Sequence, residues 1–295
     1  MNKCLVFGAN GYIGRHLVRY LTKAGHSVVP IGSRTKSIDN LLNYRSLNIC
    51  NPEDFSNISF DVDYIFFFSG LTGTYDSNIN AKEYVETNEI GLLNLLNNIK
   101  DLANPPQVVF PSSRLVYKGN EEIEIGENFP REAKTVYALN KMSCEDYLRL
   151  YALTTNIRYS VFRICVPFGN LFSEYSFGTV GHFMKQAKQD KLITIFGSGH
   201  FKRTFTYIHD IVESIAVASF NEKSINEIFN IGGHTYSLKE VATIIANYFE
   251  IGIRSIPWPE NYLVIESGST VFDSCKIDMI INKVKYREIS DWIIG

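Results

Sequence analysis

Short runs of apolar residues alternate with longer amphipathic segments through the first half of the chain. The runs predict buried strands, and in chain order they are Cys4–Phe7, Ser27–Ile31, Leu47–Cys50, Asp63–Phe68 and Val108–Phe110. Apolar residues at helical spacing follow the first run, extend over Glu83–Lys100, and recur between Tyr137 and Tyr151. Apolar strands that alternate with helices are typical of an open parallel sheet covered on both faces.

The pattern becomes less regular after Arg163, where turns and a loop rich in Ser, Tyr and Gly interrupt it. The elements predicted beyond it are helices over Val180–Lys188, Asp210–Phe220 and Leu238–Phe249 and a strand over Ile228–Ile231. We therefore expect an α/β chain whose doubly wound parallel sheet is formed mainly by residues 1–165. Residues 166–295 are expected to form mostly a smaller α/β domain, with elements near 206–232 returning to the main sheet.

The composition is that of an ordinary soluble globular protein, with 295 residues, 45% hydrophobic, 20% charged and a formal net charge of −2. This balance gives no reason to expect a surface for nucleic acid or for an anionic membrane. No apolar stretch is long enough to span a bilayer, and the first residues lack the pattern of a signal peptide.

The five cysteines are scattered, odd in number and without C-x-x-C spacing. This usage indicates reduced thiols in the cytoplasm rather than a disulfide framework or a zinc site. The histidines show no ligand spacing with one another or with a cysteine, so no metal site is predicted.

Three glycines in the spacing G-x-x-G-x-x-G separate the first predicted strand from the helix after it. Gly8 permits a tight turn, Gly11 lets a pyrophosphate approach the backbone, and Gly14 lets the helix pack closely on the strand. The N–H groups at the helix N-terminus suit an anion. The residues predicted to bind a dinucleotide here are Gly8, Asn10, Gly11, Tyr12, Ile13 and Gly14. Residues 1–165 are therefore expected to be a Rossmann-type dinucleotide-binding domain.

The second predicted strand ends in Gly-Ser-Arg, at the position where a dinucleotide fold selects its cofactor. An acidic residue there binds the ribose 2′-hydroxyl of NAD, whereas an arginine suits the 2′-phosphate of NADP. Ser33, Arg34 and Lys36 stand here, and the first acid is Asp39. NADP(H) is the favoured cofactor and NAD the alternative, while a solvated basic loop would explain the same residues without a ligand. Ser69, which closes the fourth strand, is a further predicted cofactor contact because a small residue leaves room at the sheet edge.

Tyr137 and Lys141 form a second group because they lie one helical turn apart on the same face. A tyrosine has a reference pKa of ~10 and needs a nearby cation to act as an acid or base near neutral pH. Lys141 can supply that cation and can also hold the ribose hydroxyls of the cofactor. Ser113, after the fifth strand, can bind a carbonyl oxygen. The three residues suit hydride transfer at a carbonyl or carbinol carbon, although Y-x-x-x-K alone is common on solvated helices.

Several segments of the chain form an ordered set: GANGYIG, SSRLVYKG, YALNK, FRICVPFG, GSGHFKRTFTYIHDI and FNIGG, with a weaker FDSCKID near the end. In this set the chain resembles the extended short-chain dehydrogenase/reductase family, specifically its nucleotide-sugar epimerases, dehydratases and reductases, which serve polysaccharide biosynthesis. The resemblance covers nearly the whole chain. It implies that Ser113, Tyr137 and Lys141 are catalytic. It also implies that Asn88 orders the active-site helices and, with Tyr137 and Lys141, contacts the cofactor.

The resemblance also implies a set of substrate contacts, which are Ser113, Arg114, Asn170, Arg203 and Tyr207. Arg203 and Tyr207 fall in a segment that commonly meets the nucleotide diphosphate, and an arginine fork binds phosphate bidentately. A structural salt bridge is the alternative for Arg203. Val166 departs from the family because an asparagine often contacts the diphosphate there. Arg114 replaces a small residue, and Arg114-Leu115 stands where 4,6-dehydratases carry Asp-Glu, which disfavours a dehydratase.

Three functions are compatible with these residues. The first is NADPH-dependent reduction of a nucleotide-linked 4-keto-6-deoxy sugar, with Tyr137 as the proton donor. The second is an NAD-dependent nucleotide-sugar 4-epimerase, in which the same residues remove and return the hydride. The third is a non-catalytic dinucleotide sensor, which the presence of both Tyr137 and Lys141 disfavours. The resemblance further implies a homodimer formed through Glu83–Lys100 and Thr135–Thr154.

Overall fold

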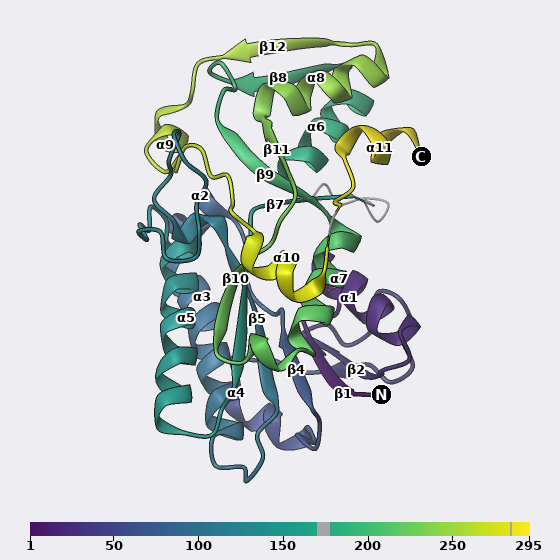
Figure 1. Ribbon diagram of the computed structural model, residues 1–295, viewed down its shortest axis with the longest axis vertical. Coiled ribbons are helices and arrows are strands. Elements are labelled where there is room, and N and C mark those ends of the chain that lie inside the picture. The colour runs from purple at the N-terminus through teal and green to yellow at the C-terminus, as the bar shows by residue number, and fades with distance from the viewer. Residues whose placement is uncertain (170–177, 284) are drawn as a thin grey trace.

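The computed structural model describes residues 1–169, 178–283 and 285–295 (Figure 1). The predicted substrate contact Asn170 lies outside these ranges. Within them the chain forms one large sheet with helices on both faces and a smaller part that holds short sheets (Figure 1).

Seven described strands form the large sheet in the order β10-β6-β5-β4-β1-β2-β3, and every neighbouring pair is parallel. Their bounds are β1 Lys3–Phe7, β2 Ser27–Gly32, β3 Arg45–Ser46, β4 Tyr64–Phe67, β5 Gln107–Ser113, β6 Tyr159–Ile164 and β10 Glu227–Asn230. The strand order runs outward in both directions from β1 and β4, which is the doubly wound arrangement. The prediction of a Rossmann-type parallel sheet is confirmed.

Both faces of this sheet are buried. Successive residues of a strand point to opposite faces, so two neighbouring residues of β1 show what covers each face. Val6 belongs to a hydrophobic cluster that includes residues of α1 and α7. Phe7 belongs to a second cluster that includes residues of α4 and α5. The bounds of these helices are α1 Tyr12–Lys23, α4 Gly91–Ile99, α5 Val136–Thr154 and α7 Ile208–Ser219. Continuous apolar runs such as the one in β1 therefore reflect helices on both sides of the sheet.

The predicted helix over Glu83–Lys100 is present, but it is not uniform. It consists of α3 Ala81–Val85, a wide π-helical turn over Glu86–Ile90, and α4. Asn88 lies within the wide turn and is buried. Such turns are frequent at functional sites because they interrupt the regular hydrogen-bond ladder of the helix. The apolar spacing alone shows one amphipathic segment and does not reveal the wider turn.

The smaller part of the molecule comes mainly from the second half of the chain. β9 lies between the parallel strand β7 and the antiparallel strand β11, and β8 pairs in parallel with β12. The strand bounds are β7 Val166–Phe168, β8 Leu192–Phe196, β9 Lys202–Tyr207, β11 His234–Ser237 and β12 Gly252–Ile256. The remaining helices are α2 Thr74–Ile79, α6 Gly178–Gln189, α8 Leu238–Phe249, α9 Glu260–Leu263, α10 Cys275–Ile281 and α11 Ile289–Ile294. α10 lies back beside β10 and α7, so the chain passes between the two parts several times (Figure 1).

The predicted strand over Leu47–Cys50 is wrong. The third strand consists only of Arg45–Ser46. The Asn51 N–H donates to the Asn48 carbonyl at 3.0 Å and closes a turn where the strand was expected to continue. The Leu47 side chain is buried, so the apolar residues of this segment contact the core from a turn.

Candidate active site

The predicted glycine loop is the turn between β1 and α1, and its geometry requires glycine. Gly8 has a φ of +77°, a left-handed conformation that favours glycine. The Gly11 N–H donates to the Gly8 carbonyl at 2.8 Å, and Gly11 stands at the N-cap of α1. A Cβ at Gly14 would lie 2.1 Å from the Gly8 carbonyl oxygen. The turn therefore lies tightly against the N-terminus of α1, which is the arrangement that binds a pyrophosphate.

Replacement of Gly14 by Ala is expected to weaken binding of a nicotinamide dinucleotide about tenfold and to lower the melting temperature, because the new methyl group would displace the Gly8 carbonyl. Overpacking of this kind typically costs ~1–3 kcal/mol. Gly126→Ala is the matched control, since a Cβ there meets nothing within 4 Å. Fluorescence titration with NADPH and a thermal melt would check both variants. Unchanged NADPH binding by Gly14→Ala would show that the turn does not hold the pyrophosphate.

Ser33 and Arg34 follow the carboxyl end of β2, and both are exposed. The Tyr44 hydroxyl donates to the Arg34 carbonyl at 2.8 Å, and Asn10 Nδ2 donates to the Tyr44 hydroxyl at 3.0 Å. These hydrogen bonds connect the glycine turn to the loop after β2. Tyr44 was not identified from the sequence because it lies in an irregular loop. The structure thus brings together two predicted cofactor contacts, Asn10 and Arg34.

Asp39 belongs to the same loop and is held by arginines of α1. Arg15 Nε and Arg19 Nη2 each donate to its carboxylate at 3.0 Å, and Arg15 Nη2 also contacts it. The hydrogen bond from Arg15 is the main cause that lowers the pKa of Asp39. A carboxylate that is already bound by two guanidinium groups is a poor acceptor for a ribose hydroxyl.

Ser69 lies in the loop that follows β4, and Asn88 contacts this loop. The Ser69 nitrogen would lie 2.7 Å from a Cβ at Gly8, so this loop touches the glycine turn. Asn88 Oδ1 accepts from the Leu71 N–H at 2.7 Å, and Asn88 Nδ2 donates to the Leu71 carbonyl at 3.1 Å. Cys144 Sγ donates to the Asn88 carbonyl at 3.3 Å. Asn88 therefore fixes the loop after β4 against α5.

Ser113, Tyr137 and Lys141 meet at the carboxyl end of β5. Ser113 is the last residue of that strand, and Tyr137 lies in the first turn of α5. The Ser113 side chain lies close enough to the Tyr137 hydroxyl to lower the pKa of that hydroxyl. Lys141 Nζ donates to the Pro111 carbonyl at 2.7 Å and lies 5.8 Å from the centroid of the Tyr137 ring. The three residues predicted to be catalytic therefore form one group.

Burial dominates the ionisation of this group. It raises the pKa of Tyr137 to about 12, although the Ser113 side chain acts in the opposite direction. It lowers the pKa of Lys141 to about 8, although Cys144 and Glu145 act in the opposite direction. The spacing to Lys141 suggested a pKa of Tyr137 below its ordinary value, but burial is the larger effect and the pKa lies above that value. Tyr137 therefore carries its proton at neutral pH, which is the state that a proton donor needs.

A buried ion pair behind the catalytic group was not identified from the sequence. Arg163 of β6 donates to both Glu145 oxygens, from Nε at 2.9 Å and from Nη2 at 2.6 Å. Ser112 also donates to Glu145, and Arg163 Nη1 donates to the Tyr117 hydroxyl at 2.6 Å. Because Ser112 belongs to β5 and Arg163 to β6, their bonds to Glu145 fix α5 against both strands one turn after Lys141. The two partners are 18 residues apart in the sequence and lie on different elements, so no local pattern indicates the pair.

Arg114 and Tyr207, two predicted substrate contacts, are largely enclosed by protein. Arg114 Nη1 donates to Ser267 Oγ at 2.7 Å and to Thr270 Oγ1 at 3.3 Å, so its side chain faces the segment after α9. The Tyr207 ring stacks on His209 with centroids 5.2 Å apart. It also lines a hollow of about 590 Å³ between α1 and α7. Arg114 therefore faces the segment after α9, whereas Tyr207 faces the hollow between α1 and α7.

Arg203, the predicted diphosphate contact, is engaged by a carboxylate. Its Nη2 donates to both oxygens of Glu266 at 2.8 Å, and Arg203 is only 5% exposed. Of the two expectations for Arg203, the structure shows the salt bridge. Glu266 follows α9 in an irregular segment, where no periodic pattern marks it in the sequence.

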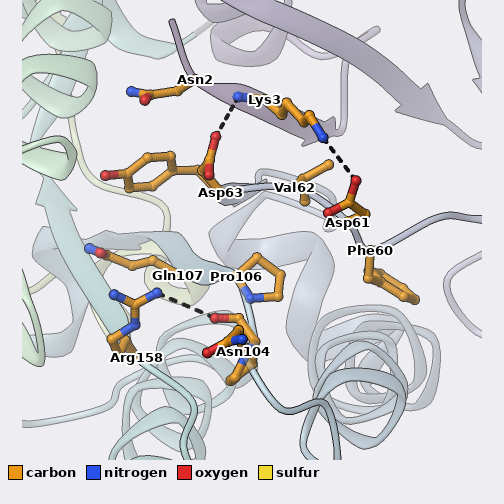
Figure 2. A pocket seen from close by; sticks show the side chains of 12 residues that line it. Asn2, Lys3, Phe60, Asp61, Val62, Asp63, Asn104, Pro106, Gln107 and Arg158 are labelled. Atoms are coloured by element: carbon orange, nitrogen blue, oxygen red, sulfur yellow. Dashed lines mark hydrogen bonds and ion pairs between the residues drawn. The ribbon is translucent and has the colours of Figure 1, made fainter.

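A separate hollow of about 390 Å³ lies at the opposite edge of the large sheet, at the amino ends of β1, β4 and β5 (Figure 2). Lys3 Nζ pairs there with Asp61 at 2.8 Å, and the Lys3 N–H donates to Asp63 at 2.7 Å. Arg158 donates to the Pro105 carbonyl at 3.4 Å. Ligands of open α/β sheets bind at the carboxyl ends of the strands, so the candidate active site lies at the other edge.

In the ranges that the structure describes, no group of three or more His, Cys, Asp or Glu side chains could hold a metal ion. No helix in the same ranges combines the length and the apolar character needed to cross a bilayer. All five cysteines are free, and Cys4, Cys144 and Cys165 are buried.

A glycine turn after the first strand of a parallel sheet and a Ser–Tyr–Lys group after the fifth define an NAD(P)-dependent enzyme of the extended short-chain dehydrogenase/reductase type. The sequence model of the NAD dependent epimerase/dehydratase family matches residues 4–232, and the chain belongs to this family. The protein is accordingly an NAD(P)-dependent oxidoreductase or epimerase.

Comparison with known proteins supports this assignment. The chain is 28% identical over 262 residues to a putative UDP-glucose 4-epimerase of Methanocaldococcus jannaschii, covering 85% of this chain and 83% of that protein. It is 28% identical over 329 residues to protein CapI of Staphylococcus aureus, covering 97% and 93%. The structure of Thermus thermophilus UDP-glucose 4-epimerase in complex with NAD matches 99% of this chain and 96% of its own, with 21% identity and a TM-score of 0.87. This last likeness confirms the fold.

Proposed function

We propose that the protein uses NADPH to reduce the C4 keto group of a nucleotide-linked 4-keto-6-deoxy sugar. The observation that carries the proposal is the state of Tyr137. Its hydroxyl lies beside Ser113 at the carboxyl end of β5, and its raised pKa retains the proton that the reduced oxygen requires. The names of relatives, UDP-glucose epimerases among them, support a nucleotide sugar as the substrate.

The cofactor-binding elements fit NADPH. The glycine turn would hold the pyrophosphate, because the position of Gly14 leaves no room for a side chain. The exposed residues Ser33 and Arg34 would hold the adenosine ribose and its 2′-phosphate. Asp39 is held by α1, which favours NADPH over NADH. When bound, the cofactor supplies the hydride.

The side chains of the protein would align the substrate and move the proton. Ser113 would donate a hydrogen bond to the keto oxygen, and Tyr137 Oη would transfer its proton to the same oxygen. Lys141 has a pKa of about 8 and is therefore largely protonated at neutral pH. Its positive charge would stabilise the phenolate that Tyr137 becomes.

A nucleotide-sugar 4-epimerase is the second candidate, and the relatives named as UDP-glucose 4-epimerases favour it. In that reaction the same Tyr137 would first accept a proton and then return it, with NAD retained and no net redox change. Two residues disfavour it, because the exposed Arg34 suits a 2′-phosphate and Asp39, already bound by Arg15 and Arg19, is a poor acceptor for the ribose hydroxyl of NAD.

The proposal is tested by incubating the purified protein with a panel of nucleotide sugars, including 4-keto-6-deoxy forms, together with NADPH or NADH. We expect stoichiometric loss of reduced-cofactor absorbance with a 4-keto sugar nucleotide, with NADPH the better donor. Interconversion of two hexose nucleotides without loss of added cofactor would establish the epimerase instead.

Arg34→Ala is expected to raise the KM for NADPH about tenfold or more and to leave the KM for NADH nearly unchanged, because a charged hydrogen bond to the 2′-phosphate contributes ~1.5–3 kcal/mol. Arg45→Ala is the matched control, since Arg45 is also an exposed arginine near the same sheet edge. Steady-state kinetics with both cofactors would check these values. Equal losses for NADPH and NADH would contradict a 2′-phosphate contact.

We also propose that the protein is a homodimer. The helices α3 and α5 and the π-helical turn support this, because they carry exposed apolar side chains. These side chains are Val85, Ile90, Leu139, Leu150 and Leu153.

A further inference from the structure

Arg114, Arg203 and Glu266 form a buried charged cluster next to the candidate active site. Arg114 directly follows Ser113, and it is 9% exposed. Burial lowers the pKa of Arg114 to about 10, and the charge of Arg203 is the next cause, so the two guanidinium groups are close. The Glu266 side chain is 12% exposed. Two buried cations therefore share one carboxylate.

Among the described residues, the guanidinium N–H groups of this cluster have fewer hydrogen-bond acceptors than they could use. Arg203 Nη2 donates to both oxygens of Glu266, but Arg203 Nε is buried without a hydrogen-bond partner. Arg114 Nη1 donates only to the uncharged hydroxyls of Ser267 and Thr270. A buried donor without an acceptor and a buried cation without a close counterion are both unfavourable, so the Glu266 carboxylate is the anion that this cluster already holds.

Glu266 is held in place by more than Arg203. Its Oε1 accepts from the Gly268 N–H at 2.9 Å, and Lys134 Nζ donates to its backbone carbonyl at 2.9 Å. Burial raises the pKa of Glu266, but the charges of Arg203 and Arg114 outweigh that effect, and the pKa is lowered. The carboxylate is therefore ionised at neutral pH, and it occupies the Nη2 edge of Arg203 that a phosphate group would use.

We propose that Glu266 is a specificity-determining residue, which occupies Arg203 and so weakens the binding of a substrate diphosphate beside Ser113 and Arg114. The inference rests on the proposed nucleotide-linked substrate. A diphosphate that approaches Arg203 meets a fixed negative charge, and like charges at close range repel. The sugar and the base therefore contribute most of the substrate affinity. Glu266 reduces the margin by which a nucleoside diphosphate binds more tightly than the uncharged nucleoside.

The test compares the binding of UDP and uridine to the full-length protein by calorimetry, without cofactor or turnover. Glu266→Gln keeps the size of the side chain and removes its charge. We expect this variant to bind UDP about tenfold more tightly than the wild type and uridine equally well, because Arg203 becomes available to the diphosphate. Glu260→Gln is the control, since it removes an exposed carboxylate from the neighbouring helix α9 and should leave both affinities unchanged.

UDP binding by Glu266→Gln that is no tighter than that of the wild type, or that is absent from both, overturns the inference. A purely structural salt bridge would lower the melting temperature without raising the affinity for UDP. If Glu266→Gln does not fold, the double variant Arg203→Gln/Glu266→Gln tests the proposed role of Glu266. Its affinity for UDP should stay within about twofold of the wild type. A tenfold loss would show that Arg203 binds the diphosphate in the wild type despite Glu266, and would overturn the inference. These measurements involve no reduction, so they are independent of the outcome of the reductase assay.

Discussion

Tyr137→Phe is expected to lower kcat for sugar reduction about 10³-fold, within the range of ~10²–10⁴ typical of a lost general acid. The variant keeps the ring and its packing and removes only the hydroxyl beside Ser113. Binding of NADPH should be nearly unchanged, because the glycine turn and the residues after β2 are untouched. Single-turnover kinetics with a 4-keto sugar nucleotide and a fluorescence titration with NADPH would measure the two effects separately.

Tyr248→Phe is the control for that experiment, since Tyr248 is an exposed tyrosine on α8 and its loss should leave turnover unchanged. Full turnover by Tyr137→Phe would remove the proposed proton donor. If the protein bound NADPH but turned over no sugar nucleotide in any form, the non-catalytic dinucleotide sensor would be the better account.

Arg163→Met is expected to lower the free energy of unfolding by ~3–5 kcal/mol, because it removes the nearest counterion of the buried Glu145 carboxylate and leaves Arg131, at 3.5 Å, as its remaining ion-pair partner. The two side chains are 2% and 1% exposed, so water cannot replace the lost hydrogen bonds. The loss should also reduce turnover in the folded fraction, since Glu145 holds α5, and with it Lys141, against β5. Urea unfolding followed by circular dichroism would measure the stability.

Two further variants separate this effect from the simple loss of a charge. Glu145→Gln/Arg163→Met removes both charges and should be less destabilising than Arg163→Met alone, because no buried charge remains unpaired. Lys3→Met breaks the exposed pair with Asp61 and should leave the stability nearly unchanged. A loss for Arg163→Met no greater than that for Lys3→Met would contradict a structural role for the buried pair.

The elements that could be predicted from the sequence rest on local patterns. The apolar run of β1 and the glycines after it lie within one short stretch, so the strand, the turn and the helix could be located together. Tyr137 and Lys141 are one helical turn apart, and Ser113 ends an apolar run, which made the catalytic group recognisable. In each case the physical cause of the pattern lies within a few residues of the chain.

The features that could not be predicted depend on contacts between distant segments. Glu266 reaches Arg203 from an irregular segment that shows no periodic pattern. Leu47 is buried in the core, but a turn at Asn48 ends the strand that its apolar neighbours suggested. Burial of Tyr137 raises its pKa, whereas the spacing to Lys141 alone suggested the opposite direction. Long-range packing decides each of these features, and a one-dimensional pattern does not contain it.

The place of β10 at the edge of the large sheet also has consequences for how the protein is made. Phe229 of β10 stacks on Phe162 of β6, with ring centroids 5.6 Å apart, yet the ribosome produces β7, β8, β9 and α7 between the two strands. At a synthesis rate of ~5–20 residues per second, several seconds pass between the synthesis of β6 and that of β10. During this time the face of β6 that α7 later covers is still exposed. The nascent chain therefore passes through a state with an unpaired strand edge, and a fragment ending at residue 165 would retain that edge permanently.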